Sequence, residues 1–192
     1  TPERWSNVNL GEKEAFNILY LTANYPHKNL EIIPAVIDSL IDLGFKDFKF
    51  YLSINESELK VNDQQKRHLG FLGKVNITQV PNIYREMNAF FMPSLLEVFS
   101  TSYLEAMYMK VPIVASDMPF SRDICGEAAL YAGPNNADEY ALKLIEIYSN
   151  TELKDKLIDF GLKNLERFSD SMGRTKKYLE IIEKHAINRY EE

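Results

Sequence analysis

Short apolar runs alternate with longer amphipathic stretches along the whole chain. Each of six short runs is apolar at nearly every position, which is the pattern of a strand buried on both faces of its sheet. These runs predict six strands, over Ile18–Thr22, Phe48–Ile54, Phe71–Gly73, Ala89–Pro93, Pro112–Ser116 and Ala129–Tyr131.

The stretches between these runs carry apolar residues at helical spacing. In Asn29–Leu43, for example, apolar side chains recur every three or four residues, and Gly44 is a typical helix stop. The same pattern predicts six more helices, over Val61–Leu69, Gln79–Met87, Ser102–Met109, Ala137–Ser149, Glu152–Phe168 and Ser171–His185.

Buried strands that alternate with helices predict an α/β fold with a mostly parallel, six-stranded sheet covered by helices on both faces. Right-handed crossovers make such a sheet doubly wound and Rossmann-like. Ligands of doubly wound sheets bind at the carboxyl ends of the strands. Candidate polar residues follow three of the predicted strands, so we expect them to meet at one edge of the sheet.

Composition narrows the functional classes. The chain has 192 residues, 45% of them hydrophobic, which fits one domain with a proper core. A net charge of −6 gives no basic footprint for nucleic acid. Cys125 is the only cysteine, so no intrachain disulfide can form and a reduced, cytoplasmic setting is favoured. No apolar run reaches the roughly 18 residues of a transmembrane segment.

The beginning of the sequence predicts a fragment of a longer protein. The chain starts at Thr1 rather than Met, and its first stretch is polar. We interpret residues 1–16 as the remnant of an interdomain linker and residues 17–192 as the domain.

Two glutamates stand out in the segment Pro93–Met107, which reads PSLLEVFSTSYLEAM. Glu97 falls in the loop after a predicted strand, and Glu105 falls inside the helix that follows. A carboxylate accepts hydrogen bonds and can bridge neighbouring sugar hydroxyls. The pair would suit a nucleotide sugar, with Glu105 on the ribose and Glu97 on the transferred sugar. Two solvated surface acids are the alternative, and a glycosidase pair fits less well because a nucleoside diphosphate needs no protonated leaving group.

Ser100, Thr101 and Ser102 stand between the glutamates, where the helix should begin. Free backbone N–H groups and the helix dipole make a helix start an anion site suited to a phosphate. Ordinary N-capping by serine or threonine is the alternative explanation.

Lys28 lies in the loop between the first predicted strand and its helix. A lysine there can reach a diphosphate as a point charge without a metal. A solvated loop lysine is the alternative. Three scattered histidines and one cysteine make a zinc site improbable.

Five blocks then match one family in the right order. They are PSLLEVFSTSYLEAM with its Glu-x7-Glu spacing, the following VPIVAS, the earlier YPHKNL and FLGKV, and the closing segments around Arg167–Ser169 and Tyr178–Glu180. From about Asn17 to Lys184 the chain resembles the C-terminal, nucleotide-sugar-binding domain of glycosyltransferase family 4 (group 1), whose enzymes have the two-domain GT-B fold.

The resemblance implies a role for each matching residue. Glu97 would contact hydroxyls of the donor sugar, to which Val98, Phe99 and Ser100 would present backbone N–H groups. Thr101 and Ser102 would lie against the diphosphate that Lys28 neutralises. Glu105 would hold the ribose, and Val75 would line the base. The implied reaction transfers a sugar from a UDP- or GDP-sugar with retained anomeric configuration, in polysaccharide or lipopolysaccharide assembly, with no cofactor and no essential metal.

Two positions depart from the family pattern. The family commonly has Gly-Arg after the first strand, whereas this chain has Thr22 and Ala23, so half of the expected cationic clamp is missing. Ser100 replaces a frequent glycine, and its N–H can still donate if its φ is negative.

The resemblance also leaves alternatives. The family's N-terminal acceptor domain is absent, so we expect this chain to bind nucleotide weakly and to transfer little or nothing alone. A non-catalytic interaction module that has lost donor binding is one alternative, and the missing arginine favours it. A pyridoxal-phosphate-dependent polysaccharide phosphorylase of the same fold is another, although no lysine is a persuasive cofactor ligand.

Overall fold

The computed structural model describes residues 15–168 and 171–187 and contains a six-stranded sheet in the order β3-β2-β1-β4-β5-β6. Every pairing between neighbouring strands is parallel, as expected. The strands are β1 Phe16–Tyr20, β2 Phe48–Leu52, β3 Leu69–Phe71, β4 Ala89–Met92, β5 Ile113–Ser116 and β6 Ala129–Ala132.

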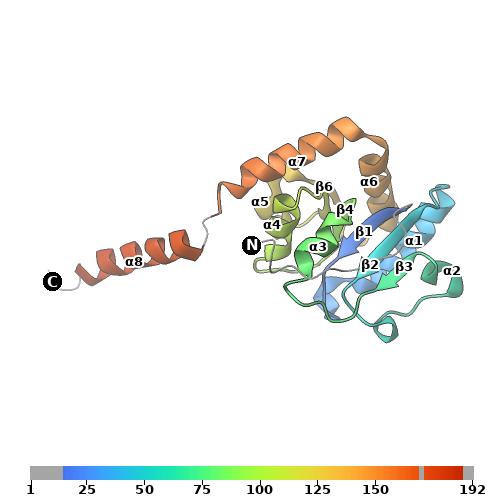
Figure 1. Cartoon of the computed structure of the whole chain (residues 1–192), viewed down its shortest axis with the longest axis horizontal. Coiled ribbons are helices and arrows are strands. Elements are labelled where there is room, and N and C mark those ends of the chain that lie inside the picture. Colours follow the sequence, from blue (N-terminus) through green and yellow to red (C-terminus); the bar gives the residue numbers. More distant parts are fainter. Residues whose placement is uncertain (1–14, 169–170, 188–192) are drawn as a thin grey trace.

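Helices follow each strand and cover the sheet (Figure 1). They are α1 Ile33–Asp42, α2 Asp63–Lys66, α3 Val80–Arg85, α4 Thr101–Tyr108, α5 Pro119–Cys125, α6 Ala137–Ser149, α7 Thr151–Leu165 and α8 Ser171–Ile187. In the described ranges, four 3₁₀ turns lie between strands and helices: η2 Pro26–Lys28, η3 Leu30–Ile32, η4 Glu56–Glu58 and η5 Gly126–Ala128. No helix in the described ranges is long and apolar enough to cross a membrane.

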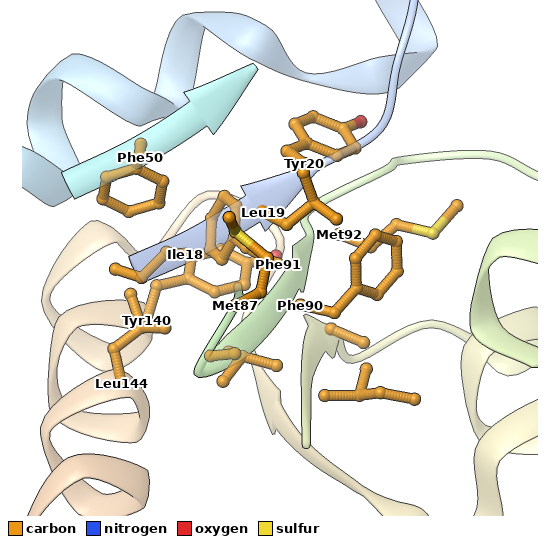
Figure 2. Packing of buried hydrophobic residues seen from close by; sticks show 14 of the residues in the cluster. Ile18, Leu19, Tyr20, Phe50, Met87, Phe90, Phe91, Met92, Tyr140 and Leu144 are labelled. Atoms are coloured by element: carbon orange, nitrogen blue, oxygen red, sulfur yellow. The ribbon is translucent and has the colours of Figure 1, made fainter. Parts of the chain in front are cut away.

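Aromatic side chains pack against both faces of the central strands. On one face Phe91 of β4 meets Tyr140 of α6 at 5.1 Å between ring centroids and Phe50 of β2 at 5.5 Å (Figure 2). On the other face Phe90 meets Tyr84 of α3 at 5.7 Å and Tyr103 of α4 at 6.4 Å. These six rings are fully buried, which confirms a sheet with helices on both sides.

α7 packs on α4 through a position that has no side chain. Gly161 is buried, and a Cβ placed there would lie 3.1 Å from Cγ of Met107. Nearby, the side-chain amide of Asn164 donates to the carbonyl oxygen of Ile124 at 2.5 Å. α7 is therefore held tightly against the helices that follow β4 and β5.

Several predicted boundaries are wrong. β3 lies at Leu69–Phe71, two residues before the predicted Phe71–Gly73, because Gly73 has a φ of +62° and already belongs to the turn. α2 is only four residues long. The helix predicted from Asn29 begins at Ile33, because Asn29 has a φ of +53° and separates two 3₁₀ turns. α5, directly after Met118, was not predicted.

The chain ends of the domain are only partly described. The linker remnant was expected at residues 1–16. Of these, residues 1–14 lie outside the described residues, and Phe16 already belongs to β1. At the other end α8 extends away from the sheet (Figure 1).

The strand order places a topological switch point between β1 and β4. From β1 the chain proceeds to β2 and β3 on one side, and then returns to β4, β5 and β6 on the other. The loops after β1 and β4 diverge at this point, and such divergence is where doubly wound sheets bind ligands. Both loops carry residues that the sequence singled out.

Candidate functional site

Lys28 and Glu97 meet at the switch point. Lys28 belongs to η2 after β1, and Glu97 lies in the loop after β4. Nζ of Lys28 lies 2.5 Å from Oε1 of Glu97, and their side chains are only 17% and 10% exposed. Two residues 69 positions apart thus form a half-buried ion pair, in which each charge neutralises the other.

Hydrogen bonds from Tyr20 and Leu95 hold the loop that carries Lys28. The hydroxyl of Tyr20, at the end of β1, donates to the carbonyl oxygen of Lys28 at 2.6 Å and lies 3.3 Å from Oγ of Ser94. The backbone N–H of Leu95 donates to the carbonyl oxygen of His27 at 2.7 Å. These contacts tie the β1 loop to the β4 loop, and they set the position of the ion pair.

Asn29 ties these loops to a third. Its side-chain amide donates to the carbonyl oxygens of Pro93, at 3.2 Å, and Pro134, at 2.8 Å. The residue also takes the left-handed conformation that asparagine tolerates better than most side chains. One asparagine therefore supplies both the turn after Lys28 and the bridge to the loops after β4 and β6.

We expect Asn29→Asp to destabilise the protein by about 2–4 kcal/mol, because carboxylate oxygens would face two carbonyl oxygens that lose their donors. Chemical denaturation of the two proteins would measure the difference. Asn29→Gly is the matched control, since it keeps the left-handed backbone and removes the bridge without adding a charge. A stability of Asn29→Asp equal to that of the native protein would contradict the bridge.

The start of α4 is not capped by a side chain. Ser100 is the N-cap residue with a φ of −113° and makes no side-chain capping hydrogen bond. Simple N-capping by Ser100 is therefore not what the structure shows, and its negative φ meets the condition for N–H donation. The next residue, Thr101, is exposed.

The loop before α4 presents apolar side chains to solvent. Val98 is 99% exposed, and Phe99 is 47% exposed with its ring 5.9 Å from that of Phe168. The side chain of Val98 is therefore open to solvent, and that of Phe99 lies beside Phe168, just after the end of α7.

A cavity of about 470 Å³ lies along the carboxyl ends of β1, β2 and β3. Three predicted site residues line it together, namely Val75 after β3 and Ser102 and Glu105 of α4. Lys28 and Glu97 do not line it. The described residues that line it are Leu21, Thr22, Ala23, Ser53, Ile54, Asn55, Glu58, Lys74, Val75, Val80, Ser102 and Glu105.

Glu105 is a partly buried carboxylate in this cavity, and burial raises its pKa above the ordinary value of a glutamate. Behind it the hydroxyl of Tyr84 donates to the carbonyl oxygen of Ser102 at 3.1 Å. Burial, and then the nearby Glu105 charge, raise the pKa of Tyr84 well above its usual value. Glu105 is thus a partly buried side chain of α4 that lines the cavity.

Ala23, where the resemblance implies an arginine, lines the cavity without supplying a charge. Ser53 holds this loop, because its hydroxyl accepts from the N–H of Thr22 at 2.6 Å and donates to the carbonyl oxygen of Thr22 at 2.8 Å. Lys74, in the turn after β3, is the only cationic side chain among the described residues that line the cavity.

Sequence reasoning missed the residues that support the site. Two buried serine hydroxyls form hydrogen bonds beneath it. The hydroxyl of Ser116 donates to the backbone carbonyl oxygen of Ser94 at 2.6 Å, and the hydroxyl of Ser121 donates to the backbone carbonyl oxygen of Ser116 at 2.5 Å. Lys74 at the cavity was inside the matching FLGKV block but was given no role, and Asn55 and Glu58 were missed altogether. The one available signal for Asn55 and Glu58 was their position just after a predicted strand, which many surface residues share.

Comparison with known proteins gives a consistent family. The family described as "Glycosyl transferases group 1" matches residues 4–164. The O-antigen chain mannosyltransferase RfbU of Salmonella typhimurium is 24% identical over 88% of this chain and 43% of its own length. The uncharacterized glycosyltransferase MJ1178 of Methanocaldococcus jannaschii is 29% identical over 85% of this chain and 48% of its own length. The chain spans less than half the length of these two relatives.

Solved structures share the fold at low sequence identity. TarM of S. aureus, in a complex that includes UDP, superposes on 91% of this chain and 37% of its own, with a TM-score of 0.72 and 17% identity. Sucrose-phosphate synthase of Thermosynechococcus elongatus superposes on 94% of this chain and 51% of its own, with a TM-score of 0.69 and 17% identity. The sequence match over most of the chain, together with this shared fold, places the chain in the group 1 glycosyltransferase family.

Proposed function

We propose that this chain is the donor-binding half of a retaining glycosyltransferase that takes its sugar from a nucleoside-diphosphate sugar. The acceptor would bind in a second domain, which agrees with a chain that spans less than half of its curated relatives. Their names include two O-antigen chain mannosyltransferases, which supports a role in polysaccharide assembly.

The observation that carries this proposal is the convergence of three kinds of group at one edge of the sheet. The uncapped start of α4 offers backbone N–H groups for a phosphate. The Lys28–Glu97 pair offers a cation for the diphosphate and a carboxylate for sugar hydroxyls. The cavity that contains Glu105 and Val75 offers room for a nucleoside beside them.

The ion pair gives the proposed site a specific mechanism. In the structure Lys28 is already neutralised, so an incoming diphosphate has to draw its ammonium group away from Glu97. The released carboxylate can then accept hydrogen bonds from donor-sugar hydroxyls. On donor binding, Lys28 would thus leave Glu97 and pair with the diphosphate, and Glu97 would bind the sugar of the same donor.

Calorimetric titration of the chain with GDP and UDP tests the proposal. We expect saturable binding of at least one of them at submillimolar to millimolar concentration, because one domain supplies only half of the cleft. No saturable binding of any nucleoside diphosphate at millimolar concentration would refute donor binding and favour a non-catalytic interaction module.

Glu105→Ala is expected to weaken nucleoside diphosphate binding about 10- to 100-fold, because ribose hydroxyls lose a charged acceptor. Binding of the native chain should also weaken on acidification at a higher pH than an ordinary glutamate would require, since burial raises the pKa of Glu105 and protonation removes its charge. Calorimetry over a pH series would measure both effects. Glu166→Ala, at an exposed glutamate after α7, is the control.

We further propose that donor binding needs no cofactor and no essential metal, because Lys28 and the α4 start supply the positive charge. Nucleotide affinity is then expected to change less than about twofold when EDTA replaces Mg²⁺ in the titration. A tenfold loss in EDTA would assign part of the diphosphate charge to a metal instead.

A further inference from the structure

The strand order gives a bound nucleotide a direction, and this step rests on the proposed function. The phosphate-binding groups lie at the switch point between β1 and β4. The cavity extends from Ser102 and Glu105 toward the turns after β2 and β3, which are farther along the same edge. With the diphosphate at the switch point and the ribose at Glu105, the base reaches the β2 and β3 turns.

The carboxylate of Glu58 lies at that end of the cavity and is held in place by hydrogen bonds. Oε2 of Glu58, in η4, accepts the backbone N–H of Asn55 at 2.7 Å and its side-chain amide at 3.1 Å. Oε1 of Glu58 makes no hydrogen bond with any described residue. The side chain is half-buried, so its orientation is set by Asn55 while one oxygen remains available to a ligand.

A cationic side chain, that of Lys74, lines the same end of the cavity. Lys74 follows Gly73, whose N–H donates to the carbonyl oxygen of Ile54 at 3.1 Å and so joins the β3 turn to the end of β2. Lys74 forms no ion pair with any described residue. The two turns therefore present one acceptor and one donor to whatever base enters.

The bases differ in what they would present to this pair. Guanine carries two adjacent donors, N1–H and the N2 amino group, next to the acceptor O6. A carboxylate can accept from both donors while an ammonium group donates to O6. Uracil carries a single N–H between two carbonyl oxygens, so a carboxylate would meet at least one oxygen. Adenine has an acceptor at N1 and no oxygen for the lysine.

We infer that Glu58 and Lys74 select guanine, so that the donor is a GDP-sugar rather than a UDP-sugar. The free Oε1 of Glu58 accepts from both the N1 and the N2 hydrogens, and Lys74 donates to O6. Asn55 acts as a positioning residue, because it holds the Glu58 carboxylate in the cavity. Val75 lies against the base and gives no discrimination of its own.

Titration of the chain with GDP, IDP, UDP and ADP tests this assignment. Binding should weaken in the order GDP, IDP, then UDP and ADP, with GDP at least tenfold tighter than UDP, because unpaired polar groups penalise the wrong base. IDP lacks only the N2 amino group and so isolates one contact. Equal affinity for GDP and UDP would overturn the guanine assignment and leave the proposed donor site intact, whereas no binding of either would refute the donor site itself.

Glu58→Gln sharpens the test, because it keeps an oxygen for Asn55 and replaces one acceptor with an amide donor. It should weaken GDP about 10- to 100-fold, leave UDP within about threefold, and gain affinity for xanthosine diphosphate, which has a carbonyl in place of the N2 amino group. Glu56→Gln is the matched control, since Glu56 belongs to the same turn but pairs with Lys66 outside the cavity.

Unchanged GDP affinity in Glu58→Gln, with a native thermal unfolding profile, would overturn the role of Glu58. Lys74→Met provides the complementary measurement. It should weaken GDP and IDP by the same factor, because both carry O6, and equal weakening of ADP would show that Lys74 serves the phosphates rather than the base.

Discussion

Glu97→Ala is expected to lower sugar transfer by about 100- to 1000-fold in a protein that carries both this chain and an acceptor domain. The reason is that Glu97 would orient the transferred sugar, and loss of one directed charged contact at a reacting centre has effects of this size. The same substitution in the isolated chain should leave GDP affinity unchanged or raise it several-fold. With Glu97 gone, a diphosphate no longer competes with a carboxylate for Lys28.

These opposite effects separate a role in binding from a role in transfer. Lys28→Ala should weaken GDP about 10- to 100-fold, because the diphosphate loses a charged donor and Glu97 remains as a repelling neighbour. Exposed Glu31, in the 3₁₀ turn next to Lys28, provides the control variant Glu31→Ala. Full transfer activity in Glu97→Ala would refute its contact with the donor sugar, and a parallel loss of GDP affinity would assign Glu97 to structural support of the loop.

The protein is also expected to unfold cooperatively as pH rises from about 10 to 12. Burial raises the pKa of Tyr20 to about 12, and burial likewise raises the pKa values of Tyr84, Tyr103 and Tyr140. Each of these hydroxyls is more acidic in the unfolded chain, so the stability that they contribute is complete below pH 10 and is lost as pH rises. Tyr20 alone would account for about 2.3 kcal/mol of lost stability at pH 12.

Circular dichroism and tyrosinate absorbance, followed together, would measure this transition. Tyr20→Phe should reduce the pH dependence of stability in this window, since phenylalanine cannot ionise, although it also removes the hydrogen bond to Lys28. Tyr25→Phe is the control, because Tyr25 is 57% exposed. Titration of all tyrosines near pH 10 without loss of structure would contradict the burial of these hydroxyls.

The fold was largely predictable from the sequence, because its strongest signals are local. Six buried strands produce six apolar runs, and the long helices α6 and α7 produce clear helical periodicity. Short elements were harder. α5 has only seven residues and follows directly on β5, so it offers too few positions for a periodic pattern. The helix predicted at Asn29 was displaced because side-chain contacts with Pro93 and Pro134 hold Asn29 in a left-handed turn.

The motifs of the candidate site could be predicted from the sequence, but the contacts between its residues could not. The expectation that the loops after β1, β3 and β4 meet at one edge is confirmed. The Lys28–Glu97 pair could not be foreseen, because the two residues are far apart in sequence and each had been assigned to a different part of the ligand. Glu58 belongs to no matching motif, Lys74 had no assigned role within FLGKV, and only the cavity relates the two residues.

The contact between α7 and α4 has a consequence for this cavity. Gly161 allows α7 to approach Met107 so closely that even a methyl group at this position would press on α4. Since α4 carries both Ser102 and Glu105, we expect the width of the cavity to depend on a residue on the far side of that helix. Substitutions at Gly161 are therefore expected to change the affinity for the proposed donor from a distance, without altering any residue that lines the cavity.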